Sequence, residues 1–215
     1  MTFAFSPLAD RGITVKLGDG ISAELSDRVV EHARAVTDAG IRGITDVVPS
    51  YSSLGVFYDP LELSYSELTA RLERVLDEMP PLSGEHSEGR LIRIPVVYDG
   101  EDLDEVCRKT KLTRSQLVEI HSSREYRVLV VGFVPGWAYL GQLDPRLIVA
   151  RRESPRKRVP PGSVAIAESQ TGIYPSETPG GWNLIGTTTE KMFDVTQAEP
   201  SLLRVGDKVR FEKVE

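Results

Sequence analysis

Apolar and polar residues along the N-terminal part of the chain alternate in a way that predicts short strands separated by two amphipathic helices. Apolar residues recur at helical spacing after Ser26 and again after Ser64. The second helix should begin with a capping box, because Ser64 and Glu67 have the required spacing, and the first should end at Gly40. The strands are expected at residues 13–17, 44–48, 54–58 and 91–98.

The order of these elements, β-α-β-β-α-β, is that of a ferredoxin-like unit. A polar stretch rich in turn-forming residues, 80–89, follows the second helix and predicts a linker. We therefore expect two domains, residues 1–89 and residues 90–215. The strand at 91–98 fits either side of this boundary, since it could complete the first domain or open the second.

The second part of the chain changes to two short helices followed by strands with long connections. Asp102 and Thr113 each stand three residues before a Glu or Gln, which predicts a capped helix start at both places. The strands are expected at residues 126–133, 163–167, 182–187, 192–195 and 208–211. Short strands joined by glycine- and proline-rich turns predict a closed or nearly closed β-barrel.

Composition narrows the class of protein. The chain has 215 residues, a net charge of -6 and 40% hydrophobic residues, which are ordinary values for a globular protein. Its apolar runs are too short to span a bilayer and its N-terminus lacks a signal-peptide pattern, so we expect a cytoplasmic protein with no membrane segment. The one cysteine, Cys107, fits a reducing compartment. The acidic balance argues against a nucleic-acid binder.

Several familiar catalytic motifs are missing from the sequence. It contains no phosphate-binding loop, no dinucleotide fingerprint and no nucleophile elbow. Its histidines, His32, His86 and His121, lie far apart without metal-ligand spacing, so we expect no metal site. If the protein takes part in ATP chemistry, its own sequence shows no standard nucleotide motif.

Glycine and proline are concentrated in residues 132–186, which hold 8 of the 18 glycines and 7 of the 14 prolines. Such a segment predicts ordered loops of defined shape, where binding sites usually lie. One run in it is basic and contains Arg151, Arg152, Arg156, Lys157 and Arg158. This run could bind a carboxylate or phosphate, dock an acidic partner, or be a solvated face. Pro155 stiffens it, which favours fixed contacts.

His121 and a group of polar residues after it are further candidates. His121 stands near the end of a predicted helix, whose negative end would favour the protonated ring and a role in proton transfer. Its spacing alone favours a histidine that satisfies terminal carbonyl groups. Gln170 and Tyr174 could bind a small polar ligand or belong to a turn that satisfies its own backbone. Aromatic walls could come from Phe133, Trp137, Tyr139 and Trp182.

Four motifs in order along the chain resemble the allophanate hydrolase subunit 1 family. They are GFVPGWAYLG at residues 132–141, PRKRVPPGSV at 155–164, QTGIYP at 170–175 and PGGW at 179–182. The resemblance covers nearly the whole chain. That family includes the B subunit of bacterial 5-oxoprolinase, the sporulation-kinase inhibitor protein and one half of the carboxyltransferase domain of urea carboxylase.

The resemblance implies an α+β protein with a ferredoxin-like N-terminal domain and a cyclophilin-like β-barrel domain. It implies one component of an ATP-dependent 5-oxoprolinase, which opens 5-oxoproline to L-glutamate and whose components do not act alone. The partners would be an allophanate hydrolase subunit 2-like protein, which is the C subunit of 5-oxoprolinase, and a third protein, its A subunit. ATP and magnesium would act at the level of that complex, and no cofactor is evident in this chain alone.

Carried onto this sequence, the resemblance implies a cleft shared with the partner barrel. The catalytic residues would be His121, Arg156 and Arg158. The substrate-binding residues would be Phe133, Pro135, Gly136, Trp137, Gln170, Tyr174, Gly180, Gly181 and Trp182. This sequence departs from the family at Thr187, where an arginine is usual, so one anion contact is missing.

Two other functions are compatible with the same resemblance. A regulatory protein that inhibits a sensor histidine kinase would need only a docking face and no intact cleft. A urea-carboxylase-like carboxyltransferase or allophanate hydrolase component would need a biotin-carrying partner, because this chain has no Met-Lys-Met biotin site. Of the three, the 5-oxoprolinase component is our expectation.

Overall fold

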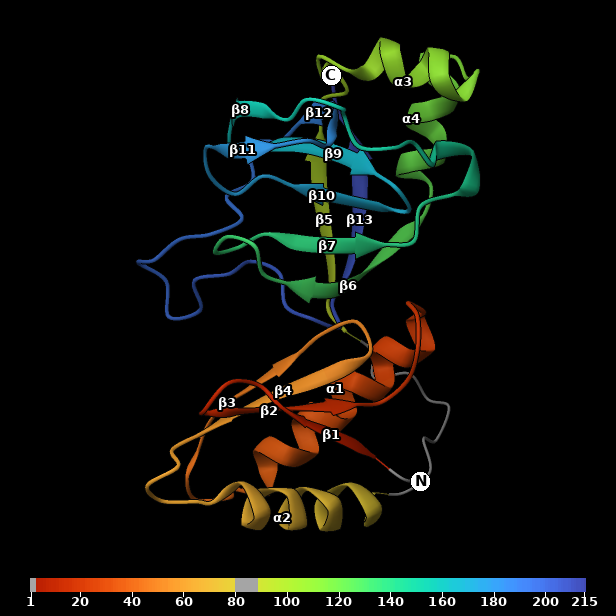
Figure 1. Cartoon of the computed structure of the whole chain (residues 1–215). Coiled ribbons are helices and arrows are strands. Elements are labelled where there is room, and N and C mark those ends of the chain that lie inside the picture. The colour runs from red at the N-terminus through yellow and green to blue at the C-terminus, as the bar shows by residue number, and fades with distance from the viewer. Residues whose placement is uncertain (1–2, 80–88) are drawn as a thin grey trace. The chain divides into compact units, whose positions relative to one another are not determined.

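The computed structural model describes residues 3–79 and 89–215. The chain divides into two compact units, Met1–Glu88 and Gly89–Glu215 (Figure 1). Each unit has its own hydrophobic core. Most of the predicted linker, residues 80–89, lies outside the described residues. Among the described residues, none of the helices combines the length and the apolar character that crossing a membrane requires.

Unit 1 contains an antiparallel sheet with the strand order β1-β2-β4-β3, and α1 packs against β3, β4 and α2. The strands are β1 (Ala4–Pro7), β2 (Gly12–Lys16), β3 (Ile44–Pro49) and β4 (Ser53–Tyr58), and the helices are α1 (Ala23–Asp38) and α2 (Tyr65–Asp77). Apolar residues from the sheet and both helices form one core, which explains the period-2 and helical patterns in the sequence.

The helix ends in unit 1 follow local side-chain chemistry. The predicted capping box of α2 is confirmed, because Ser64 Oγ accepts from the Glu67 N–H (3.3 Å) and Glu67 Oε2 accepts from the Ser64 N–H (3.0 Å). Helix α1 begins earlier than predicted, since Ser22 caps it and Ser26 is buried inside it. Gly40 follows α1 with a φ of +55°, as expected for a helix stop.

The strand expected at residues 91–98 belongs to unit 2 and not to the first sheet. It forms β5 (Leu91–Val96), which pairs in parallel with β13 (Lys208–Lys213). The outer strand of the unit 1 sheet is instead β1, which pairs antiparallel with β2 and was not predicted. Burial of Ile94 and Val96 in the unit 2 core is what places β5 there.

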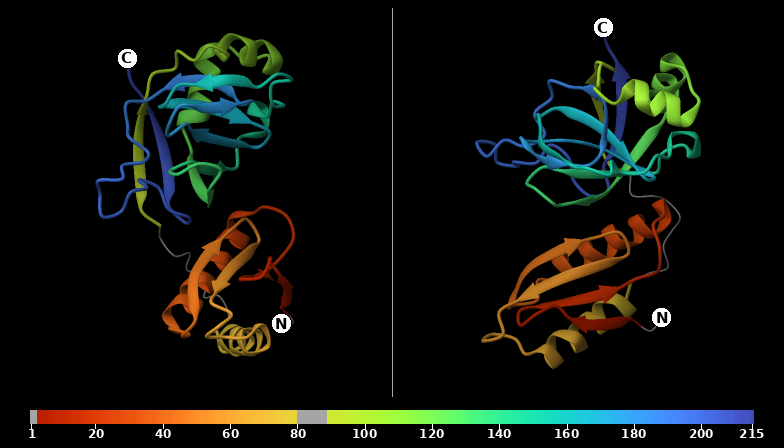
Figure 2. Two further views of the ribbon diagram at one scale, coloured as in Figure 1. Left: turned by 60° about the vertical axis from the view of Figure 1, so that its left-hand side comes forward. Right: turned by 45° about the horizontal axis from the view of Figure 1, so that its top comes forward.

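Unit 2 is built on a seven-stranded sheet with the order β12-β9-β10-β7-β6-β13-β5. Its remaining strands are β6 (Glu125–Val131), β7 (Ala138–Gly141), β9 (Ser163–Ala167), β10 (Gln170–Ile173) and β12 (Asn183–Thr187). The two outer strands meet, because Val97 and Thr187 exchange backbone hydrogen bonds of 2.9 and 2.8 Å. The chain is therefore a mixed α+β protein with a nearly closed barrel, as predicted, and the curvature is visible in Figure 2.

Two helices and a small strand pair complete unit 2. Helix α3 (Leu103–Thr110) packs against β12, and α4 (Arg114–Ser122) packs against β13. The strand pair joins β8 (Arg156–Val159) to β11 (Thr178–Gly180), and a short 3-10 helix, η1, covers Pro145–Leu147. The capping box predicted at Thr113 is confirmed. Asp102 precedes α3 but makes no side-chain cap, so that expectation was wrong.

Two further expectations in unit 2 need correction. The strand predicted at 192–195 does not form, and Phe193 makes only an isolated bridge to Ser201. A turn replaces it because Asp194 Oδ1 accepts from the N–H of Thr196 (3.0 Å). Residues 170–173, which could have been a ligand-binding turn, form the interior strand β10, which lies between β9 and β7. Strands as short as β7, β8 and β11 carry too few residues for alternation to reveal them.

Candidate functional site

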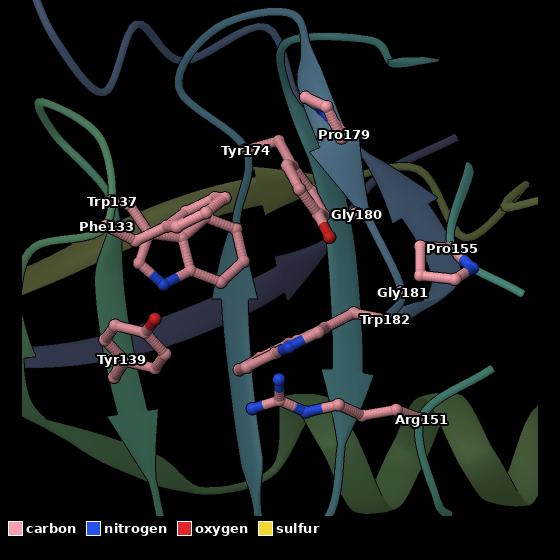
Figure 3. Close-up of a pocket in the computed structure, with 10 residues that line it drawn as sticks. All are labelled: Phe133, Trp137, Tyr139, Arg151, Pro155, Tyr174, Pro179, Gly180, Gly181 and Trp182. Carbon is pink, nitrogen blue, oxygen red and sulfur yellow. The ribbon is translucent and has the colours of Figure 1, made fainter. Parts of the chain in front are cut away.

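An aromatic pocket of about 210 Å³ opens in unit 2 (Figure 3). It is lined by Phe133, Trp137, Tyr139, Arg151, Pro155, Tyr174, Pro179, Gly180, Gly181 and Trp182. These residues come from the β6–β7 turn, from β7, from residues 151–155, and from the segment that runs from the end of β10 to the start of β12. Segments distant in the sequence therefore meet at one cavity.

Trp137 is the centre of the aromatic wall. Its ring makes edge contacts with the rings of Tyr139, Tyr174 and Trp182, at centroid distances of 5.6, 4.6 and 5.0 Å. Trp137, Tyr174 and Trp182 are at most 5% exposed, whereas Phe133 is 63% exposed at the rim. Edge-to-face packing holds rings in fixed orientations, so the wall is preformed.

The β6–β7 turn positions Phe133 and Trp137. It is closed by hydrogen bonds from the Gly132 N–H to the Trp137 carbonyl (3.0 Å) and from the Trp137 N–H to the Val134 carbonyl (3.1 Å). Gly136 has a φ of +82°, and a Cβ there would lie 2.6 Å from Phe193 Cβ. Phe133 itself has a φ of +76°, an uncommon conformation for a residue with a side chain, and such positions concentrate at functional sites.

Two polar side chains that line the pocket have groups with no hydrogen-bond partner among the described residues. Trp137 is 2% exposed, and its indole nitrogen makes no hydrogen bond within the described residues. Figure 3 shows this nitrogen on the edge of the ring that is turned toward Tyr139. The guanidinium of Arg151 lies 6.0 Å from the centroid of the Trp182 ring, within range of a cation–π contact. Burial raises the pKa of the Tyr174 hydroxyl, which therefore stays protonated at neutral pH.

The basic run divides into residues with different surroundings. Arg152 Nη1 and Arg156 Nη2 both donate to Asp102 Oδ1, at 2.5 and 2.8 Å, and Arg156 also donates to Glu101 Oε2 (3.1 Å). Arg158 is 80% exposed and lies 3.6 Å from Glu177 Oε1. Of this run, only Arg151 lines the aromatic pocket. Arg156 and Arg158, the predicted catalytic cations, are not among the lining residues.

Asp102 connects part of the basic run to β12. Its side chain is 3% exposed, and its Oδ2 accepts from the Leu184 N–H (2.7 Å) while Oδ1 holds the two arginines. Burial by itself would raise the pKa of this carboxyl group, but the hydrogen bonds from Arg156 and Leu184 and the charges of Arg156 and Arg152 outweigh burial and lower it. Asp102 therefore stays ionised and ties residues 152–156 to β12.

His121 lies in the core and does not line the pocket. Its ring is fully buried and stacked on Phe211 at 4.5 Å. Its Nδ1 lies 2.8 Å from the Tyr98 hydroxyl and its Nε2 lies 3.0 Å from Thr171 Oγ1. Because the Thr171 hydroxyl donates to the Ala165 carbonyl (3.0 Å), Nε2 must carry the ring proton and Nδ1 must accept from Tyr98.

The protonation state of His121 differs from the one expected at a helix end. Burial lowers the pKa of its imidazole to about 3, so the ring is neutral at physiological pH. The helix-end argument assumed a solvated ring, but the barrel core surrounds this one. His121 also does not satisfy terminal carbonyl groups, since its ring nitrogens face hydroxyl groups.

The structure brings together part of the predicted binding set. The predicted residues that line the pocket are Phe133, Trp137, Tyr174, Gly180, Gly181 and Trp182. Pro135, Gly136 and Gln170 do not line it, and Gln170 instead pairs with Gly141 and Ala167 in the sheet. Arg151, Pro155 and Pro179 had not been assigned to the site. Tyr139, which the sequence suggested as an aromatic wall residue but not as a substrate-binding one, also lines the pocket.

The described part of the chain has neither a cluster of metal-binding side chains nor the arginine that is usual at position 187. The described residues contain no group of three or more His, Cys, Asp or Glu side chains that could hold a metal ion. Thr187, which replaces the usual arginine, donates from its hydroxyl to Asp99 Oδ1 (2.9 Å). The threonine therefore takes part in the protein's own hydrogen bonding.

Comparisons with known proteins point to one family. The family model of the carboxyltransferase domain, subdomain C and D, matches residues 3–203. The 5-oxoprolinase B subunit of Bacillus subtilis is 35% identical over 224 residues, which cover 99% of this chain and 93% of that protein. The 5-oxoprolinase B subunit of Haemophilus influenzae is 38% identical over 208 residues, which cover 95% of each chain.

Solved structures agree with this family. The crystal structure of TTHA0988 matches with a TM-score of 0.85 and 40% identity over 95% of this chain, and this chain spans 40% of the length of TTHA0988. A conserved uncharacterized protein from Pyrococcus horikoshii, PH0987, matches with a TM-score of 0.58 and 40% identity over 99% of this chain and 98% of that one. Urea carboxylase of Kluyveromyces lactis is 18% identical over 99% of this chain and 22% of its own length, and its TM-score of 0.77 shows a shared fold.

These matches extend over nearly the whole length of the sequence and agree with its four motifs. The histidine-kinase alternative is not favoured, because the relatives are named as the B subunit of 5-oxoprolinase. The chain belongs to the carboxyltransferase domain family, subdomain C and D, and it fits the allophanate hydrolase subunit 1 family that its motifs resemble.

Proposed function

We propose that this chain is the B subunit of an ATP-dependent 5-oxoprolinase, which opens 5-oxoproline to L-glutamate. The observation that carries the proposal is the 35–38% identity, over 95–99% of the chain, to three proteins that carry this name. The matched length includes residues of both units. A shared fold alone would not support an activity, because one fold serves many functions.

In this proposal the chain acts with an allophanate hydrolase subunit 2-like protein, the C subunit, and with a third protein, the A subunit. TTHA0988 supports a physical association with further domains, because this chain accounts for only 40% of that longer chain. ATP and magnesium act at the level of the complex, since the sequence has no standard nucleotide motif. A lactam is stabilised by amide resonance, so its opening benefits from activation, for instance by phosphorylation of its oxygen.

The same proposal extends to the domains. We propose residues 1–89 as a variant ferredoxin-like domain, in which β1 takes the outer position that a strand after α2 would otherwise fill. We propose residues 90–215 as a cyclophilin-like barrel that carries the site. The strand order of the first sheet and the meeting of β5 and β12 in the second support these assignments.

We propose that the substrate occupies the aromatic pocket. Arg156 then acts as a positioning residue, because it donates to Asp102, which also accepts from Arg152 next to the lining residue Arg151. Arg158, which is exposed beside Glu177, would contact a partner chain. The catalytic role of His121 stays a prediction, and its buried, neutral ring would need the barrel core to open before it could exchange a proton.

Reconstitution tests the proposed function. The purified chain and its two partner proteins are combined with 5-oxoproline, ATP and magnesium, and glutamate and ADP are measured. We expect release of glutamate only when all three proteins are present. A verified three-protein assembly that releases no glutamate from 5-oxoproline would contradict the proposal. Glutamate release by this chain alone would contradict the predicted need for partners.

A further inference from the structure

The aromatic pocket has one cationic group among its lining residues, the guanidinium of Arg151. This group carries five hydrogen-bond donors on a fixed fork. The indole N–H of Trp137 has no hydrogen-bond partner within the described residues, but its nitrogen is fully buried, so a ligand in the pocket cannot reach it without a shift of the surrounding rings.

Arg151 differs from the neighbouring arginines in whether a carboxylate pairs with its guanidinium group. Arg152 and Arg156 are paired with the buried carboxylate of Asp102, whereas Arg151 has no carboxylate within 4.0 Å in the described part of the chain. It contacts the face of Trp182 instead. In Figure 3 its guanidinium group lies alongside the Trp182 ring at the pocket. Arg151 is therefore available to bind a ligand.

The charge of the pocket excludes one class of ligand. Aromatic boxes often bind quaternary ammonium groups through cation–π contacts. Here the lining residues include an arginine and no aspartate or glutamate, so a cationic ligand would meet an uncompensated positive charge. The same charge attracts an anion, and a carboxylate fits the guanidinium fork with two parallel hydrogen bonds.

The volume and the walls of the pocket further limit the size and shape of the ligand. A cavity of about 210 Å³ is smaller than the roughly 300–1,000 Å³ of pockets for drug-sized molecules. Its walls are the faces and edges of preformed rings, which favour a small ligand with a ring that packs against them. Tyr174 keeps its proton, so the phenol adds no negative charge that would repel an anion.

We propose that this pocket binds a small ring-bearing carboxylate, with its carboxylate on the Arg151 guanidinium and its ring against the aromatic wall. The proposal rests on the proposed function in naming 5-oxoproline as the matching molecule, since this lactam has a small ring and a carboxylate. The contact with Arg151 would select the acid over its uncharged amide.

Intrinsic fluorescence can test this directly, because the only two tryptophans of the chain, Trp137 and Trp182, both line the pocket. The full chain is titrated with 5-oxoproline and, separately, with its primary amide, which keeps the ring and loses the charge. We expect a saturable change in emission with both, and binding of the acid on the order of tenfold tighter. No saturable change with either ligand would overturn the proposal.

Two variants separate the pocket cation from charge in general. Arg151→Gln should reduce the preference for the acid over the amide to about one. Lys157→Gln removes one charge from the same run outside the lining residues and should keep the wild-type preference. An Arg151→Gln protein that keeps the wild-type preference would refute the assignment of Arg151.

This test and the reconstitution fail in different ways. If the chain binds 5-oxoproline through Arg151 but the full assembly releases no glutamate, the proposed function fails and the binding site stands. If the assembly turns over and the chain shows neither binding nor an acid preference, the proposed function stands and the pocket assignment fails.

Discussion

Single residues decide the shape of the pocket, and Gly180 is the clearest example. A Cβ at this position would overlap the Tyr174 hydroxyl, so only glycine lets β11 pass this close to the ring. At the next position, Gly181, a Cβ would lie 3.7 Å from Pro155 Cγ, which is an ordinary contact. Adjacent glycines thus have different steric requirements.

This difference gives a matched pair of variants. Gly180→Ala should destabilise unit 2 by about 1–3 kcal/mol, because the Tyr174 ring or β11 must shift. Gly181→Ala should change stability by less than about 0.5 kcal/mol. Denaturant unfolding followed by tryptophan emission measures both, since Trp137 and Trp182 report only on unit 2. Equal stabilities of the two variants would show that the close contact with Tyr174 does not exclude a side chain at position 180.

His121 makes the stability of unit 2 sensitive to acid. The pKa of a histidine is near 6.5 in the unfolded chain and about 3 for His121 in the folded chain. Between these values the unfolded chain binds a proton that the folded chain does not, so the stabilising contribution is complete above about pH 6.5 and falls as pH is lowered toward 3.

Replacing His121 by glutamine should therefore make the unfolding free energy of unit 2 less dependent on pH. Glutamine does not titrate, so the fall in unfolding free energy between about pH 6.5 and pH 4.5 should be smaller, by up to about 1.4 kcal/mol per pH unit. The comparison uses tryptophan emission in denaturant at each pH, and the carboxylates common to both proteins serve as the internal reference. Identical pH slopes would mean that the folded protein admits a charged imidazole.

Among the secondary-structure elements, α3 and β12 are joined by one carboxylate. Asp102 stands at the start of α3, yet it accepts hydrogen bonds from Leu184 in β12 and from Arg152 and Arg156. The capping boxes at Ser64 and Thr113 were predictable because both partners are three residues apart. The partners of Asp102 are 50 to 82 residues away, so local spacing wrongly suggested a cap.

Removing the charge of Asp102 should weaken the connection between α3 and β12. Asp102→Asn leaves two partly buried guanidinium groups without their carboxylate, and we expect a loss of about 3 kcal/mol in the unfolding free energy of unit 2. Asp104→Asn is the control, because Asp104 pairs with Arg114 at the surface and should contribute less than about 1 kcal/mol. Equal losses in both variants, measured by chemical denaturation, would argue against Asp102 as the link.

For the whole molecule, the two units have separate cores with no shared residues. The unit 2 sheet is completed by strands from both ends of that unit, since β13 lies between β6 and β5. Unit 2 therefore closes on itself. Such a unit has the features of a domain that folds without the rest of the chain.

Truncation tests this independence. A fragment of residues 89–215 should unfold cooperatively with the tryptophan emission of the full chain. A fragment of residues 89–206, which lacks β13, should not, because Val209 and Phe211 leave the core and two strands lose their partner. Near-ultraviolet circular dichroism and denaturant titration measure both fragments. A well-folded shorter fragment would refute the central role of β13.

The sequence by itself determined the elements whose signals are local and the family whose motifs are contiguous. The helix caps at Ser64 and Thr113, the longer strands and the resemblance to relatives of 35–38% identity all depend on residues close together along the chain. Only the tertiary structure decided that β5 pairs with β13, that Arg151 and not Arg156 or Arg158 lines the pocket, and that His121 is buried and neutral. Pairing, burial and charge compensation depend on contacts between distant segments, and periodicity and spacing carry no information about those.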